Sequence, residues 1–338
     1  QSPHPDWDVF RAINPSALAT YNKLMSWWWT VQDALPEVLA LVRDLFATTP
    51  NDLEAAYTAW AKLDKKHGWG IKPGVTAAQV YNPGQGKGQN RPKADKLQMG
   101  NVDGFWLLEW LKMVGLFHGG FTRIVANPKD PRNAKDRKTY VLAPVHLEWG
   151  RHLEVLKHFR PAMIGSATAV KLDILAALRY TRAFLLHYEE ARGSDQEMEL
   201  FGTRPCDLVS GMQTAFYKNL GQSGAVMNIA AINLPRWVDT RCPDALAHLA
   251  AALDENITIV QRLDETRGDQ FSLLNDYRDF LSSQDLDPFF RFTTAYGAHV
   301  MQQYERRVYV QPHTTTSLEV IFMNTENPTY GQIVNDDG

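Results

Sequence analysis

Apolar residues recur three and four positions apart along most of the chain, the spacing that gathers them on one face of an α-helix. This pattern predicts helices over 15–29, 33–48, 53–66, 102–117, 148–159, 166–192, 206–220, 244–265, 268–282, 285–304 and 315–325, with a short last turn at 328–334. Runs rich in β-branched and aromatic residues predict strands over 121–126, 139–145 and 226–234. The predicted fold class is therefore α+β and mostly helical.

The character of the pattern changes near residue 240. Before it, helices alternate with short strands, which we expect to pair antiparallel. After it, four helical segments follow one another, and two of them carry facing apolar surfaces, built from Tyr277, Phe280 and Leu281 and from Leu286 and Phe289. We therefore expect a mixed α/β region over 1–240 and a C-terminal four-helix bundle over 241–338.

The stretch over 81–93 interrupts this apolar pattern. It holds glycines at alternate positions, Gly84, Gly86 and Gly88, together with two prolines, three cations and four side-chain amides. Such a composition cannot bury a core, and it leaves backbone N–H groups open to close approach by a ligand. We interpret it as a ligand-facing loop that precedes an apolar helix carrying Phe105, Trp106 and Trp110.

Charge is unevenly distributed, although the net charge of the whole chain is only −3. Residues 62–96 hold eight Lys or Arg against two Asp, which gives +6, and residues 123–138 hold six against two, which gives +4. Such segregation favours a surface that faces a polyanion. The alternative is two solvated loops. Arg179 and Arg182, on the predicted long helix, could also reach a phosphate backbone, but arginines there are usually just solvated.

The two basic stretches supply the candidate nucleic-acid-binding residues. Amides could read base edges, and cations could contact phosphates, although turn formation is the alternative role of each amide. Tyr81, Trp69 and Tyr140 lie beside these stretches and could stack on a base. The candidate site consists of Asn82, Gln85, Lys87, Gln89, Asn90, Arg91, Lys93, Lys96, Arg132, Lys135, Arg137 and Lys138.

No catalytic, metal or cofactor motif emerges from the sequence. Lys87 is followed by Gly88, where a phosphate-binding P-loop needs Ser or Thr, and the dinucleotide fingerprint is also absent. His146, His152 and His158 are six residues apart and would not share a helix face. We therefore expect no cofactor, no metal and no enzymatic activity of this chain.

The cysteine content and the hydropathy of the chain indicate the cellular compartment of the protein. The two cysteines, Cys206 and Cys242, are few for a chain of 338 residues and indicate a reducing setting. No signal-peptide pattern or apolar run near the ~20 residues of a membrane span is present. We expect a cytoplasmic location. The absence of an initial Met suggests a piece of a longer polypeptide.

Several segments together resemble the large subunit of type I CRISPR surveillance complexes (Cascade). Each match is short, and together they are scattered along nearly all of the chain. The matching residues are His4-Pro5-Asp6-Trp7-Asp8 with Ala12-Ile13-Asn14-Pro15, Asn82-Pro83 with Gly86-Lys87-Gly88, Asn90 and Lys93-Ala94, the run from Phe105 to Lys112 with Gly115-Leu116, Tyr277-Arg278 with Phe280-Leu281, Asp285-Leu286 with Phe289-Phe290, Phe292 and Tyr296, Ser317-Leu318-Glu319-Val320, and Gly331 with Ile333.

The resemblance implies a non-catalytic subunit in antiviral defence that binds guide RNA, target double-stranded DNA and the other subunits of the complex. Such a subunit recognises the short motif adjacent to the target (the PAM), helps to open the duplex and stabilises the R-loop. By this resemblance, the loop around Lys87 and Asn90 would sense the motif, and residues 132–138 would contact the DNA backbone. A nuclease-helicase or a transposition factor would act downstream.

Two other functions stay open at this point. One is an enzyme whose catalytic residues converge only in the folded chain, which would show a deep pocket lined by perturbed carboxylates or histidines. The other is a helical scaffold that binds only proteins. That scaffold predicts that Lys87, Arg91 and Lys93 can be neutralised without any effect on nucleic-acid affinity.

Overall fold

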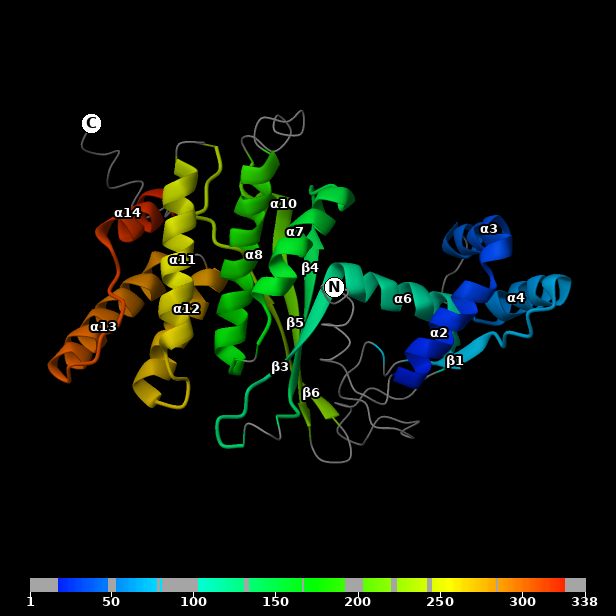
Figure 1. The fold of residues 1–338 in the computed structure, drawn as a ribbon, viewed down its shortest axis with the longest axis horizontal. Coiled ribbons are helices and arrows are strands. Elements are labelled where there is room, and N and C mark those ends of the chain that lie inside the picture. Colours follow the sequence, from blue (N-terminus) through cyan, green and yellow to red (C-terminus); the bar gives the residue numbers. More distant parts are fainter. Residues whose placement is uncertain are drawn as a thin grey trace. The chain divides into compact units, whose positions relative to one another are not determined.

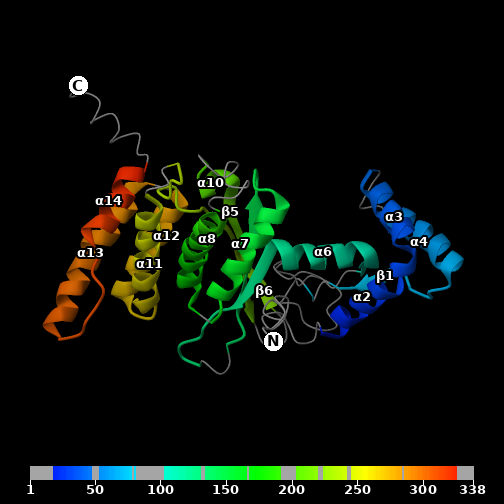
Figure 2. The same ribbon diagram turned by 45° about the horizontal axis from the view of Figure 1, so that its top comes forward.

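The computed structural model describes residues 18–47, 53–77, 80, 103–130, 134–165, 167–191, 203–219, 224–241, 245–283 and 285–325. The chain forms two compact units, whose helices and strands are labelled in Figures 1 and 2. Unit 1 comprises 1–123, 135–139 and 215–229, and unit 2 comprises 124–134, 140–214 and 230–338. The predicted fold class, a mostly helical α+β chain with small antiparallel sheets and a helical C-terminal part, is confirmed.

The helices of unit 1 follow the apolar periodicity of its sequence. Its elements are α2 (Leu18–Thr30), η2 (Gln32–Ala34), α3 (Leu35–Ala47), α4 (Leu53–His67), β1 (Gly74–Thr76), β2 (Asp103–Phe105) and α6 (Trp106–Gly119). Trp60, Phe105 and Trp106 are fully buried, and the Trp60 ring meets the Trp106 ring edge to face at 5.0 Å. The indole of Trp60 donates to the backbone oxygen of Ile71 at 2.8 Å, so this buried polar group is satisfied.

A four-stranded sheet has the order β3-β4-β5-β6, so strands adjacent in sequence are adjacent in space. The strands are β3 (Gly120–Ile124), β4 (Arg137–Pro144), β5 (Val209–Asn219) and β6 (Gly224–Ile232). The predicted strands over 121–126, 139–145 and 226–234 thus correspond to β3, β4 and β6.

The predicted helix over 206–220 is wrong. Only α10 (Pro205–Leu208) is helical there, and the chain then runs as the strand β5. Val209, Gly211, Met212 and Thr214 are buried while Ser210 and Gln213 are exposed, so the strand alternation holds on each side of Gly211–Met212 and is interrupted at that adjacent buried pair. Gly211, at φ +124°, takes a backbone conformation that disfavours a side chain.

The helices of unit 2 pack around α8 (Ala169–Ala191). Residues on every side of this helix are buried, which is typical of a helix enclosed by neighbours. In Figure 1 it stands between α7 (Trp149–Ala162) and α11 (Leu246–Arg262), and it packs on both of them and on α12 (Gly268–Ser283). The C-terminal helices are therefore built onto α8.

The four helices predicted after residue 244 are all present. They are α11, α12, α13 (Leu286–Glu305) and α14 (Thr315–Asn324), with α12 packed on α13 and α11 on α14. Unit 2 also includes α7 and α8, so this compact unit begins before residue 241. The closed four-helix bundle and a domain boundary at 240 stay predictions, and the expected turn at 328–334 lies outside the described residues.

Candidate functional site

Nine of the twelve predicted nucleic-acid-binding residues lie outside the described part of the chain. These are Asn82, Gln85, Lys87, Gln89, Asn90, Arg91, Lys93, Lys96 and Arg132. The remaining three are Lys135, Arg137 and Lys138, at the start of β4. Proximity of the predicted residues to one another therefore stays a prediction, and the structure instead describes the elements on which the two basic stretches are mounted.

A two-stranded ladder within unit 1 flanks the glycine-rich stretch in the chain. The chain leaves β1 at Thr76 and returns in β2 at Asp103, and these two residues face each other in an antiparallel register. Their side chains also hydrogen bond, from the Thr76 hydroxyl to the Asp103 carboxylate. Trp106 N donates to the backbone oxygen of Pro73 at 2.9 Å, next to the ladder. Thr76 and Asp103, which flank residues 77–102 in the chain, are thus held side by side next to the aromatic core.

The three described residues of the second basic stretch differ in exposure. Lys135 is exposed, Arg137 is half-buried and Lys138 is buried. Burial lowers the pKa of Arg137, and its Nη1 donates to the backbone oxygen of Asp136 at 3.1 Å. The Asp136 carboxylate accepts from the backbone N–H of Asn219 at 2.8 Å. Lys135 is thus the most open to a phosphate of these three cations.

The aromatic side chains proposed for base stacking are used in packing. Tyr140 is fully buried, and its hydroxyl donates to Asp173 at 2.9 Å, so the interpretation of Tyr140 as a stacking residue is wrong. Trp69 is half-buried, with its ring stacked on His67 at 4.5 Å and on Trp60 at 5.6 Å. Tyr81 lies outside the described residues.

The three consecutive tryptophans of α2 divide their roles, as their directions on a helix require. Trp28 stacks on Trp110 at 3.8 Å, and Trp27 meets Trp106 at 5.8 Å. Trp29 is 80 % exposed. Two of the three therefore fasten α2 to α6, while Trp29 faces solvent in this chain.

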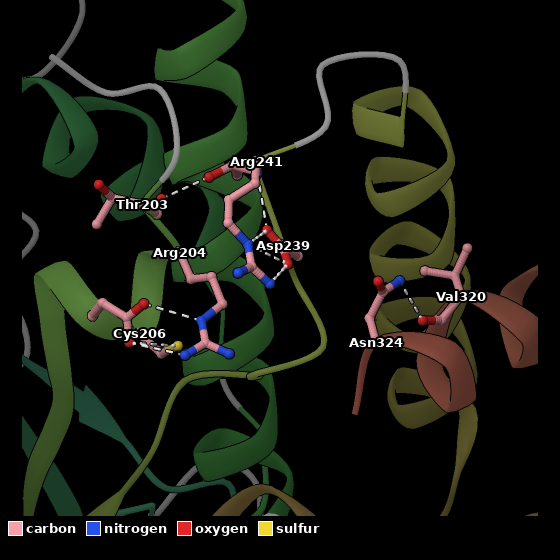
Figure 3. A network of polar contacts seen from close by, with 9 residues as sticks. Thr203, Arg204, Cys206, Asp239, Arg241, Val320 and Asn324 are labelled. Atoms are coloured by element: carbon pink, nitrogen blue, oxygen red, sulfur yellow. Dashed lines mark hydrogen bonds and ion pairs between the residues drawn. The ribbon is translucent and has the colours of Figure 1, made fainter. Parts of the chain in front are cut away.

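Unit 2 contains a cluster of two arginines beside α10, each paired with an aspartate (Figure 3). Arg204 Nε donates to Asp207 at 3.0 Å, and Arg241 Nε donates to Asp239 at 2.9 Å. The hydrogen bonds from Arg241 hold the pKa of Asp239 below its usual range. Because each guanidinium already has a carboxylate partner, this cluster is better suited to fastening the chain than to binding an external anion.

Cys206, in the same cluster, has no thiolate character. Burial first, and then the neighbouring Asp207, raises the pKa of its thiol to about 11. A thiol with such a pKa is a poor nucleophile near neutral pH. Within the described ranges, no three His, Cys, Asp or Glu side chains gather as a metal-binding group, and no helix has the length and apolarity to cross a bilayer.

A cavity lies in unit 2, beside the first turns of α8, and has a volume of about 410 Å³. One wall is the α8 stripe of Thr168, Leu172, Leu175 and Arg179, which recur at helical spacing, and Lys171 borders it. The opposite wall comes from the end of α11 and the turn after it. The remaining lining residues are Ala126, Pro128, Met163, Ile164, Gly165, Ala167, Gln261, Asp264 and Glu265.

Sequence reasoning missed this cavity. The spacing of Thr168, Leu175 and Arg179 was a visible signal for one wall, but it did not reveal what faces that wall. The Glu265 carboxylate accepts from the backbone N–H groups of Val170, at 3.1 Å, and Lys171, at 3.2 Å, across 95 positions in the chain. Only the fold brings these segments together.

Comparison of the chain with protein-family models, with curated proteins and with solved structures gives no match.

Proposed function

We propose that this chain is a non-catalytic, nucleic-acid-binding subunit of a CRISPR RNA-guided surveillance complex, acting in the cytoplasm. In this proposal it recognises the motif adjacent to the target in double-stranded DNA and stabilises the R-loop formed with the guide RNA. Its partners are the other subunits of the complex, with a nuclease-helicase or a transposition factor acting afterwards.

The proposal rests on the β1–β2 ladder that flanks the glycine-rich stretch. Segment 77–102 contains four cations, Lys87, Arg91, Lys93 and Lys96, and the residues that flank it, Thr76 and Asp103, are paired in the β1–β2 register. A loop that must read a DNA motif needs a fixed base, because ordering a free segment on binding subtracts from affinity. The aromatic packing of Trp60, Phe105 and Trp106 supplies a rigid support for that base.

The arrangement of unit 2 supports the proposal in a second way. Helices α11 and α12 pack on α8, and they in turn carry α14 and α13. Several apolar side chains on α13 and α14 are exposed, including Met301 at 68 % and Met323 at 84 %. Exposed apolar side chains of this kind suit contacts with other subunits in an assembly.

Salt dependence of DNA binding tests the proposed interface. Replacing Lys87, Arg91 and Lys93 by Ala should weaken duplex binding, since each lost phosphate contact lowers the slope of log affinity against log salt by about 0.9. The measurement is fluorescence anisotropy of a labelled duplex at four or more salt concentrations. A slope lower by about 2 to 3 is expected from three contacts.

The matched control neutralises three exposed cations outside the proposed interface, Arg43, Lys157 and Arg306. This variant removes the same net charge from the chain, so it corrects for the general field of the protein. We expect its slope to stay close to that of the unchanged chain. Equal slopes for all three proteins would remove segment 77–102 from the interface.

A further inference from the structure

The cavity beside the first turns of α8 contains a cation without an acidic partner. Among the described residues, the hydrogen-bonding partner of the Arg179 guanidinium is the thioether of Met163, with Nη1 3.8 Å from Sδ. A thioether is a weak acceptor and carries no charge. Arg179 is half-buried, and this burial lowers its pKa. The fold therefore holds a partly desolvated guanidinium at the cavity wall, with most of its five donors available.

The acidic residues around the cavity do not neutralise Arg179. The Glu265 carboxylate is bound to the backbone N–H groups of Val170 and Lys171, and so it caps α8 from outside. Asp264 accepts from the backbone and hydroxyl of Thr266, which hold its pKa below the usual range. Both carboxylates also attract Lys171, so their partners are these donors and this cation rather than Arg179.

Two further donors face the same space. Lys171 Nζ donates to the backbone oxygen of Gln261 at 3.0 Å, which leaves two of its three protons for other acceptors. The Thr168 hydroxyl is buried and has no hydrogen-bond partner in the described part of the chain. A buried hydroxyl without a partner is unfavourable, so an acceptor that enters the cavity would satisfy it.

Apolar side chains fill the rest of the wall. Met163, Leu172 and Leu175 line the cavity, and Gly165, in a backbone conformation with φ +107°, forms the turn that bounds it. A Cβ at this glycine would meet no atom within 4 Å, so the turn leaves open space beside it. The volume of about 410 Å³ falls in the range of about 300–1,000 Å³ typical of small-ligand pockets.

We propose that this cavity binds a phosphate group carried on an apolar or flat body, as in a nucleotide. Arg179 holds the phosphate through its planar fork of donors, and Thr168 and Lys171, two to three turns nearer the start of α8, offer hydrogen bonds to polar groups of the attached body. The apolar wall accommodates the sugar or base. The phosphate comes either from a free mononucleotide or from the terminus of a nucleic-acid strand. This site is separate from segment 77–102 and does not depend on the function proposed above.

Calorimetric titration of the whole chain with adenosine 5′-monophosphate, adenosine and inorganic phosphate tests the site. Adenosine monophosphate should bind at least about tenfold more tightly than adenosine, because only the former supplies the partner of Arg179. Arg179→Met keeps the length of the side chain against Met163 but removes the charge, and it should weaken binding of the monophosphate by about tenfold or more. Thr168→Val should weaken it by a smaller factor.

Arg182→Met is the matched control on the same helix. Arg182 already pairs with Asp254 at 3.2 Å and does not line the cavity, so its replacement should leave monophosphate affinity unchanged. Circular dichroism melting of each variant verifies that it is folded. Equal affinity for adenosine and its monophosphate, equal binding by Arg179→Met and the unchanged chain, or no binding of any of the three probes at millimolar concentration would each overturn the proposal.

Two oligonucleotides distinguish the source of the phosphate. A short single strand with a 5′-phosphate is compared with the same strand carrying a 5′-hydroxyl, each competing against bound adenosine monophosphate. Displacement by the phosphorylated strand alone assigns the site to a strand terminus. Displacement by neither assigns it to free nucleotides. Equal displacement by both strands would contradict recognition of a terminal phosphate.

Discussion

Glu255, on α11, is a carboxylate only 10 % exposed that holds the start of α14. It accepts from His313 Nδ1 at 3.1 Å and from the backbone N–H of Thr314 at 3.1 Å. Burial alone would raise its pKa, but hydrogen bonds from His313, Thr314 and Ser317 outweigh burial and bring the pKa below the ordinary value of 4.5. The ionised form is therefore the one that the fold stabilises.

A pH dependence follows from that lowered pKa. Stability contributed by Glu255 is fully present above pH 4.5, its unfolded value, and is lost as the pH falls through the lower folded value. Glu255→Gln should reduce the free energy of unfolding at pH 7 by about 1.5–3 kcal/mol, typical of hydrogen bonds to a charged group. Urea unfolding at pH 7, 5 and 3.5 measures this difference, which should shrink at the lowest pH. A difference independent of pH would contradict the assignment.

Gly211 is a second position where one residue type is required. Its φ is +124°, and a Cβ there would lie 3.1 Å from Asn233 Cα and closer still to the backbone oxygen of Ile232. Both neighbours are backbone atoms, which cannot rotate away. Gly211→Ala should therefore lower the free energy of unfolding by about 1–3 kcal/mol, the range for a strained backbone conformation. Ser210→Ala is the control, and equal melting of the two variants would contradict this account.

At the scale of elements, three C-terminal helices meet at one buried polar group. Asn256 on α11 accepts from the Tyr277 hydroxyl on α12 at 3.0 Å, and its amide nitrogen donates to Ser317 on α14 at 3.4 Å. Asn256 and Tyr277 are fully buried. A buried network of this kind fixes which helix faces pack together, because a shifted packing would leave its members unsatisfied.

Tyr277→Phe tests this network with little change of volume. The variant leaves the Asn256 side-chain oxygen buried without its donor, so the free energy of unfolding should fall by about 1–3 kcal/mol. Tyr309→Phe removes a hydroxyl on the same unit from a side chain that is 67 % exposed, and should have almost no effect. Chemical denaturation of both proteins measures the difference, and equal stability would show that the network carries no net stabilisation.

Elements were predictable from the sequence where an apolar period was long and uninterrupted. The helix expected over 53–66 is α4 (Leu53–His67), and the one expected over 285–304 is α13 (Leu286–Glu305). The error at β5 has a physical cause. Val209, Met212 and Phe216 are spaced three and four apart, as on a helix, while Thr214 favours a strand and Gly211 disfavours a helix. Pairing beside β4 and β6 decides such a mixed segment.

At the scale of the whole molecule, contacts between distant segments could not be predicted from the sequence. Arg179 was a plausible phosphate ligand from its place on a helix, but its cavity needs Glu265 to close the start of α8. Tyr140 was placed beside a basic stretch correctly, yet its side chain is directed to Asp173 in the core. The local sequence pattern predicts where a residue lies on its helix or strand. Whether that residue is buried depends on which distant segments pack against it.

The basic stretches remain the part of the molecule on which the proposed function depends. Four Lys or Arg lie in segment 77–102, and β1 and β2 bring the residues on its two sides together within unit 1. Recognition loops that extend from a rigid element are a common arrangement for binding sites.

Co-purification tests that central claim most directly. The chain is expressed with the backbone subunits of a CRISPR surveillance complex and a guide RNA, and the isolated ribonucleoprotein is assayed for duplex DNA binding with and without the motif that flanks the target. The account predicts that the chain joins the particle and that its presence makes DNA binding depend on the motif. A particle that assembles without this chain, or that binds DNA equally whether the chain is present or absent, would contradict the account.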